Sequence, residues 1–223
     1  MDSARIYENC QGRLLDLAAT LDREQLDTVV PACPDWTVHQ VFAHLAGLSA
    51  EVAEDKVTPP ATDEVTARQV ADREHLGIDE IGAQWRDSAP ALVEIMRTRK
   101  RARYSLPALD VWHHENDIRG ALGLEAQTAD ADQLAAFPLG GLAKGWPDEA
   151  PSLRVEAADT GQEWNLGQGG ALTLSGTAFE LARAVTGRRS VAQILAMDWS
   201  GGDPAPVAPF LPTLPAPKVD LSV

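Results

Sequence analysis

The sequence has no run of about eighteen apolar residues, the length that a membrane-spanning helix needs. Its first residues include Asp2, Arg5 and Glu8, whereas a signal peptide would place an uninterrupted apolar run there. Both absences lead us to expect a soluble protein of the cytoplasm that does not bind membranes.

Cysteine is also scarce. The chain contains only Cys10, which lies within a helical pattern, and Cys33, which precedes a proline. Two such residues give no basis for a disulfide framework. We expect both thiols to be reduced and partly buried.

Basic residues are outnumbered. The chain has 19 lysines and arginines against 33 aspartates and glutamates, and its formal net charge is -14. A surface with this charge repels nucleic-acid phosphates and anionic lipids, so neither is expected as a partner. An anionic substrate would need a local arginine as its anchor. Arginine outnumbers lysine and alanine is abundant, which favours a GC-rich, actinobacterial source.

The first part of the chain has the pattern of amphipathic helices, because its apolar residues recur every three or four positions. Thr37 and Gln40 form a capping-box pattern, and Pro107 and Gly123 suit the beginning and the end of a helix. The expected helices cover 6–21, 38–48, 78–96 with an upstream extension through 65–70, and 109–122, with a solvated loop at 97–103. Residues 1–128 are therefore predicted to form a four-helix bundle.

The pattern changes after about residue 130. We expect a helix at 132–144, strands at 153–157, around 164–166 and at 172–174, and helices at 177–185 and 191–196. Six prolines between Pro204 and Pro217 predict an extended strap. Residues 129–223 are thus expected to form a small α+β domain, which makes the fold class of the whole chain α+β.

Three residues predict a metal site. His44 lies one turn from both Val41 and Leu48 in the second expected helix, so it faces the core. Asp110 and His114 are four residues apart, which places them one turn apart on the same helical face. Buried carboxylates and imidazoles are costly unless they are paired or bind a metal. The three side chains together suit a metal ion such as zinc and leave one coordination position for an exogenous ligand.

The fourth expected helix permits a second interpretation. Asp110, His114 and Asp117 would then form a stripe facing solvent, with the apolar residues of the helix on the buried side. This arrangement would place His113 and Glu115 close to the buried face, so we disfavour it. With the inward arrangement, Asp117 is expected to orient the imidazole of His114. The remaining histidines are placed at the surface or behind the ligands: His39, His75 and His113.

Two stretches carry recognisable motifs. Residues 33–47 contain CPDWTV followed by AHLAG, and residues 110–123 contain DVWHHENDIR followed by ALG. They resemble the two signatures of the mycothiol-dependent maleylpyruvate isomerase family, whose N-terminal bundle is DinB-like. The resemblance implies a divalent metal, usually zinc, held by His44, Asp110 and His114. The family usually has glutamate where this chain has Asp110, and with the shorter carboxylate the metal would lie nearer the fourth helix.

The resemblance extends to the second part of the chain. Residues 181–188, which end in Thr186-Gly187-Arg188, are similar to the end of the family's sterol-carrier-like C-terminal domain. Arg188 is a candidate for holding a substrate carboxylate or part of the thiol cofactor, because a planar guanidinium matches carboxylate geometry. Trp36 and Trp112 are close in sequence to the proposed ligands. They either pack in the core or line the pocket, and Trp36 is our candidate for cofactor binding.

The implied cosubstrate is mycothiol or a similar low-molecular-weight thiol. A thiol that coordinates the metal ionises, and the thiolate attacks a small electrophile. In an isomerase the thiolate adds to a double bond, the adduct rotates, and elimination restores the thiol. In a transferase the conjugate is released. We expect a thiol-dependent isomerase or S-transferase that is a monomer or a weak homodimer.

Two alternatives remain open at this point. A non-catalytic or regulatory module would hold a structural metal, with a fourth ligand from His113 or Cys33. A zinc hydrolase would use Asp117 as its general base, and turnover without a thiol would identify it.

Overall fold

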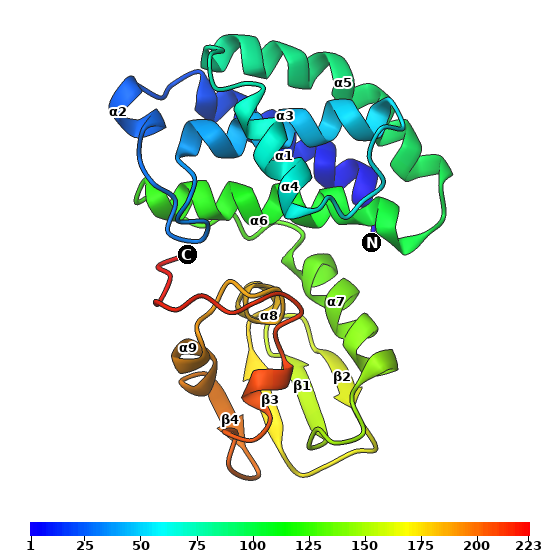
Figure 1. Ribbon diagram of the computed structural model, residues 1–223. Coiled ribbons are helices and arrows are strands. Elements are labelled where there is room, and N and C mark those ends of the chain that lie inside the picture. The colour runs from blue at the N-terminus through cyan, green and yellow to red at the C-terminus, as the bar shows by residue number, and fades with distance from the viewer. The chain divides into compact units, whose positions relative to one another are not determined.

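The computed structural model describes residues 1–223, and the chain divides into two compact units, Asp2–Gln127 and Thr128–Ser222. The first unit is entirely helical (Figure 1). Its elements are α1 (Ser3–Ala18), α2 (Arg23–Leu26), α3 (Val38–Ala53), α4 (Asp63–Ala71), α5 (Ile78–Thr98), the 3-10 turn η1 (Ala102–Ser105) and α6 (Leu106–Ala121).

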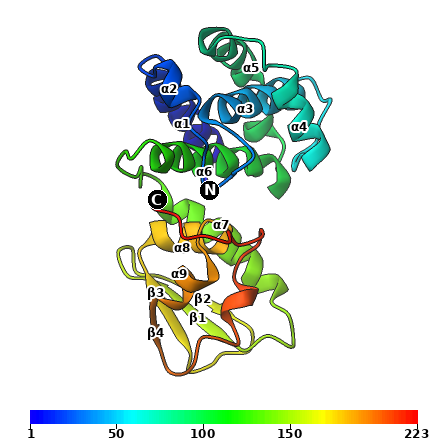
Figure 2. The ribbon, with the colours of Figure 1, turned by 60° about the vertical axis from the view of Figure 1, so that its left-hand side comes forward.

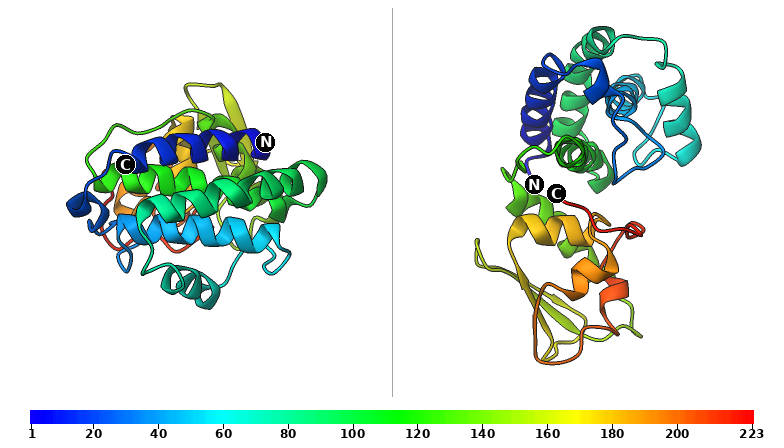
Figure 3. Two further views of the ribbon diagram at one scale, coloured as in Figure 1. Left: turned by 90° about the horizontal axis from the view of Figure 1, so that it is seen from above. Right: turned by 90° about the vertical axis from the view of Figure 1, so that its left-hand side faces the viewer.

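Four long helices build the core of this unit. α3 packs on α5, α1 packs on both α5 and α6, and α3 also contacts α6. Seen from above, the four helices lie side by side (Figure 3). The capping box predicted at the start of α3 is present, because Thr37 Oγ1 accepts from the Gln40 amide and Gln40 Oε1 accepts from the Thr37 amide. The predicted four-helix arrangement is therefore confirmed.

The expectation for 65–70 was only partly right, because these residues form a separate helix, α4, rather than an extension of α5. α4 is tied to α3 by Glu51, whose carboxylate accepts hydrogen bonds from Arg68 at 2.6 Å and from Gln69 at 2.7 Å. Gly47 permits this close approach, since a Cβ at that position would lie 2.7 Å from Gln69 Cβ. The expected loop at 97–103 was also too long. α5 continues to Thr98, and η1 begins at Ala102.

α6 is buried along most of its length. Pro107 lies in its first turn, where the missing amide hydrogen costs little, and Gly123 follows its end with φ +65°. The solvent-facing alternative for this helix is wrong, because His114 and Asp117 are buried together with its apolar residues, and only Asp110 is partly exposed. His113, expected at the surface or behind the ligands, is 3% exposed and packs edge-on against Trp112 with 5.0 Å between ring centroids. His75 is exposed, and His39 is half-buried with its Nε2 2.9 Å from Leu76 O.

Glu115 anchors α6 to α1. Its two carboxylate oxygens accept hydrogen bonds from Arg13 at 2.8 and 2.7 Å, and Oε1 also accepts from Arg119 at 3.3 Å. The side chain of Glu115 is 1% exposed, so two arginines replace the water that this carboxylate has lost. This bidentate pair fixes the helix that carries Asp110 and His114.

The second unit has a four-stranded sheet with strand order β2-β1-β3-β4. β1 pairs antiparallel with β2 and parallel with β3, and β3 pairs antiparallel with β4. Figure 2 shows the sheet with its helices, of which α7 packs on α8 and on β2. The elements are α7 (Ala131–Gly145), β1 (Leu153–Ala157), β2 (Gln162–Leu166), β3 (Thr173–Gly176), α8 (Ala178–Val185), α9 (Val191–Leu195), β4 (Asp198–Ser200) and η2 (Ala208–Phe210). The α+β class is confirmed, while β4 and η2 were not anticipated.

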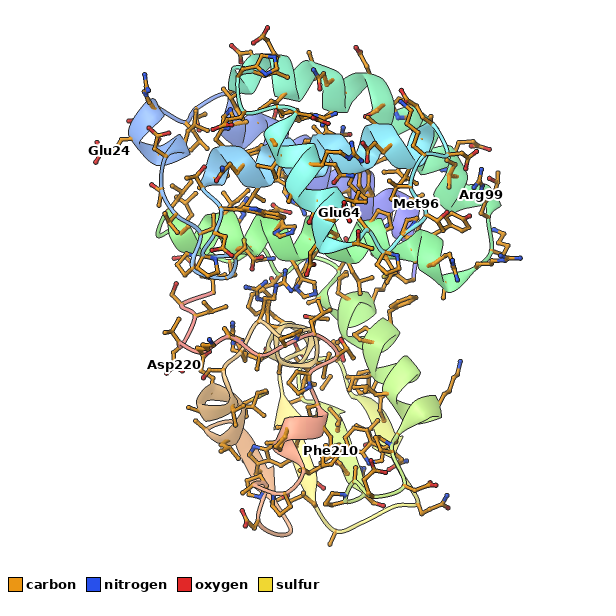
Figure 4. The ribbon with its side chains drawn as sticks, in the orientation of Figure 1. Glu24, Glu64, Met96, Arg99, Phe210 and Asp220 are labelled. Carbon is orange, nitrogen blue, oxygen red and sulfur yellow. The ribbon has the colours of Figure 1, made fainter.

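The proline-rich tail is irregular apart from η2, and it is bonded to the α+β unit. The Thr213 amide and hydroxyl both donate to Val185 O at 2.8 Å. Asp220, labelled in Figure 4, accepts a hydrogen bond from Ser190 Oγ at 2.5 Å. Gly187, with φ +72°, ends α8 where the tail passes, and a Cβ there would lie 2.7 Å from Leu214 O. Only glycine fits this crossing.

None of the helices combines the length and the apolar character that crossing a bilayer requires.

The Glu115→Gln substitution should lower the free energy of unfolding by about 1–3 kcal/mol, because Arg13 and Arg119 lose a buried carboxylate while the side chain keeps its size. Chemical denaturation followed by circular dichroism measures this change. Asp27→Asn is the matched control, since it removes the carboxylate of an exposed pair with Arg23 and should leave the stability unchanged. Equal stability of the two variants would contradict the anchoring role of Glu115.

Candidate metal centre

The structure brings His44, Asp110 and His114 together within the helical unit. His44 projects from α3, and the other two residues project from successive turns of α6. His44 Nε2 lies 3.2 Å from Asp110 Oδ2, and His114 Nε2 lies 3.5 Å from Asp110 Oδ1. One potential ligand atom from each of the three residues lies within 4.8 Å of the other two. The i, i+4 spacing and the inward histidine thus converge as the sequence predicted.

The cluster is buried on its histidine side and open on its carboxylate side. The side chains of His44 and His114 are 5% and 6% exposed, whereas that of Asp110 is 30% exposed. The two imidazole rings stand nearly perpendicular, with 5.4 Å between their centroids. An exogenous ligand could therefore reach the cluster beside Asp110 without disturbing the packing of the histidines.

Charge interactions inside the cluster shift two pKa values. Burial raises the pKa of Asp110, but the neighbouring His114 and His44 outweigh it and hold that pKa well below 3.8. Burial likewise lowers the pKa of His114, but the charge of Asp110 and the polar contacts of the ring with Asp110, Asp117 and Cys33 raise it well above 6.5. Without a metal, the pair is an aspartate beside an imidazolium.

These three residues fit a divalent ion. Two imidazole nitrogens and a carboxylate oxygen are the donors that zinc takes in open, catalytic sites. In addition, His44 Nδ1 is buried without a hydrogen-bond partner. Only Asp110 therefore fixes the tautomer of His44, and an ion placed between Nε2 and the carboxylate could take the position of the Nε2 proton while that proton moves to Nδ1.

Asp117 lies behind His114. Its Oδ2 is 3.2 Å from His114 Nδ1, and its side chain is 0% exposed. A carboxylate at this position holds the imidazole in place and keeps the opposite nitrogen, Nε2, directed at Asp110. Asp117 therefore lies where a residue that orients His114 was expected.

The two tryptophans differ in their surroundings. Trp36 is half-buried and lies over both imidazoles, with ring centroids 5.1 Å from His44 and 6.4 Å from His114. Trp112 is fully buried and packs against His113. Trp36 therefore lines the cluster, and Trp112 belongs to the core.

Arg188 belongs to the other unit, where it follows α8. Its amide donates to Arg183 O at 2.8 Å, and its Nη1 donates to Thr186 O at 3.3 Å. The neighbouring Arg189 makes a bidentate pair with Glu180 at 2.8 and 2.9 Å. Arg183, in α8 itself, is 0% exposed. Sequence reasoning missed Arg183, although an arginine within the apolar face of an amphipathic helix is a signal that could have identified it.

An inward histidine and an aspartate–histidine pair in a helical bundle, with a small α+β unit following, define a bundle protein with a candidate metal centre. A family model described as the mycothiol maleylpyruvate isomerase N-terminal domain matches residues 7–119. The chain belongs to this family. The resemblance seen in the sequence is thereby confirmed, as is the expectation of an enzyme of the thiol-dependent isomerase class.

Two solved structures have a similar fold. One is a histidine-to-alanine mutant of mycothiol-dependent maleylpyruvate isomerase, which is 16% identical, with a TM-score of 0.62 over 92% of this chain and 94% of that chain. Another is mycothiol-dependent maleylpyruvate isomerase itself, also 16% identical, with a TM-score of 0.57 over 83% and 88% of the two chains. A comparison with curated proteins gave no match. Identity this low supports a shared fold and leaves the substrate to be argued from the site.

Adding zinc to chelator-treated protein should raise its melting temperature, because an ion that binds only the folded state stabilises it. At 100 times the dissociation constant the gain is about 2.7 kcal/mol, or roughly 5–10 °C for a chain of this size. A thermal-shift assay measures the rise. His114→Ala should abolish it, whereas His75→Ala, which removes an exposed histidine, should preserve it. Identical melting with and without zinc in the unaltered protein would contradict the metal centre.

Metal affinity should increase with pH. The folded-state pKa of His114 lies above 6.5, and a metal must displace the proton from this imidazole. Between pH 6.5 and that raised pKa, the apparent affinity should rise about tenfold per pH unit and then level off. The stability of the metal-free protein should depend on pH in the opposite direction. Protonated His114 contributes its full stabilisation below pH 6.5, and this contribution is lost as the pH rises through the raised pKa of the folded state.

Titration calorimetry at several pH values tests this dependence. Asp117→Asn removes one of the groups that raise the pKa of His114, so its affinity should level off at a lower pH than in the unaltered protein. A metal affinity that does not change above pH 6.5 would show that the ion does not displace a proton from His114.

Proposed function

We propose that the protein is a metal-dependent isomerase that uses a low-molecular-weight thiol, mycothiol in particular, to act on a small electrophile. The observation that carries the proposal is the convergence of His44, Asp110 and His114 beside a partly exposed carboxylate. A divalent metal held by these residues would lower the pKa of an incoming thiol and so supply a thiolate at neutral pH.

The chain's own residues prepare this position. Asp117 holds His114 from behind, so the imidazole does not rotate away when a ligand arrives. Trp36 covers both imidazoles and excludes water from that side, which strengthens the charge interactions within the cluster. Access is left beside Asp110, and we propose that the thiol enters there.

The reaction needs no redox partner. The thiolate adds to a carbon–carbon double bond, the resulting single bond rotates, and elimination restores both the double bond and the thiol. Arg188 is our candidate for holding a substrate carboxylate, since the strongly acidic chain needs a local cation for an anionic substrate. Maleylpyruvate, named for both solved structures, is the substrate to test first.

Several finer points stay predictions. They are zinc as the physiological ion, release of a thiol conjugate as in an S-transferase, the monomeric or weakly dimeric state, and the cytoplasmic location in an actinobacterium. The hydrolase alternative, with Asp117 as general base, is disfavoured by the position of Asp117 behind His114 rather than beside Asp110.

His114→Ala should reduce thiol-dependent isomerisation by more than about 100-fold, because it removes a metal ligand, whereas Asp117→Asn should reduce it by about 10–100-fold. The assay follows isomerisation of maleylpyruvate with and without mycothiol. His75→Ala and Cys10→Ser are the controls and should keep most of the activity, since neither residue lies in the cluster.

Two outcomes would contradict the proposal. Turnover that does not depend on the thiol would favour the hydrolase. Loss of turnover in Cys33→Ser, with the zinc-dependent rise in melting temperature intact, would make the nucleophile internal.

A further inference from the structure

A second group of potential ligands lies on the other side of His114. Cys33, His114 and Asp117 each offer a donor atom, and these sulfur, nitrogen and oxygen atoms all lie within 4.8 Å of one another. Asp117 Oδ2 is 3.2 Å from Nδ1 of the imidazole, whereas Nε2 faces Asp110. The Cys33 thiol lies close enough to His114 to contribute to the raised pKa of this imidazole. One histidine is thus shared by two donor sets.

The unused bonding capacity of this imidazole points to a ligand. His114 Nδ1 is buried, and this nitrogen has no hydrogen-bond partner of good geometry, although Asp117 Oδ2 lies 3.2 Å away. The His114 side chain is 6% exposed and that of Asp117 is 0% exposed. Cys33 is half-buried, so the thiol lies where an ion could enter.

The backbone holds Cys33 in this place. The Cys33 amide donates to Val30 O at 3.0 Å, and the Trp36 amide donates to Cys33 O at 2.9 Å. Val29 and Thr37 close the turn as an antiparallel bridge. The thiol is therefore presented by a turn with fixed ends rather than by a free loop.

We propose that Cys33, His114 and Asp117 form a second metal site, selective for soft divalent ions such as Cd²⁺, that competes with the first site for His114. A thiolate, an imidazole and a carboxylate together favour softer ions than two imidazoles and a carboxylate do. On binding, the metal–sulfur bond forms and the thiol proton is released to solvent.

Competition follows from the chemistry of imidazole. A neutral ring has one nitrogen with a free lone pair, and its other nitrogen carries the proton. An ion on the Cys33 side uses Nδ1 and leaves the proton on Nε2, which removes His114 from the set with His44 and Asp110. Soft ions would therefore inactivate the first site without occupying it. This inference goes beyond the proposed function, because it requires no turnover.

A titration of chelator-treated full-length protein with CdCl₂ tests the proposal, with the ultraviolet charge-transfer absorption of the cadmium–thiolate bond as the readout. The absorption should appear and saturate at one equivalent. It should be lost in Cys33→Ser and kept in Cys10→Ser, the matched control at the only other cysteine. Absence of the absorption from the unaltered protein, or its persistence in Cys33→Ser, would overturn the proposal.

His44→Ala separates a second site from a fourth ligand of the first site. This variant removes a ligand of the first set only. The absorption should therefore remain, and the dissociation constant for cadmium should stay within about threefold of that of the unaltered protein. Loss of the absorption in His44→Ala would mean that Cys33 closes the first site, and the second site would not exist. A zinc-dependent rise in melting temperature in Cys33→Ser shows that this variant is folded.

Discussion

The burial of α6 is the constraint on which the rest of the helical unit depends. Asp110, His114, Glu115 and Asp117 lie on one helix that is buried along most of its length, so each of them needs a polar partner. Arg13 of α1 supplies two hydrogen bonds to Glu115, and His44 of α3 faces Asp110. The bundle is assembled around these polar side chains as much as around its apolar core.

The same constraint explains the state of the candidate centre. Removing water from a carboxylate and two imidazoles makes each charge depend on its neighbour, which is why Asp110 and His114 hold opposite charges when no metal is bound. A metal ion bound by these residues would take the place of one proton. The donor atoms already converge in the metal-free protein, so we expect the site to be prepared by folding.

Much of this could be predicted from local sequence. Helical periodicity, the capping box at Thr37 and the four-residue spacing of Asp110 and His114 are all short-range patterns, and the structure reproduces them. The long-range pairs could not be predicted in this way. Arg13 and Glu115 are separated by 102 positions, and a single sequence contains nothing that links them. The burial of His113 was missed for a related reason, because periodicity assigns one buried face to a helix and α6 is buried on more than one.

The fastening of the tail has a consequence for biosynthesis. The α+β unit is not complete until residues 213 to 221 have bonded to the ends of α8 and α9, since Thr213 binds Val185 and the Leu221 backbone bonds Gln193. The helical unit, by contrast, has all of its long helices once residue 121 has left the ribosome. Domains generally fold as they emerge, so the two units should mature in sequence. A chain truncated before residue 213 would have a finished bundle and an α+β unit without these bonds.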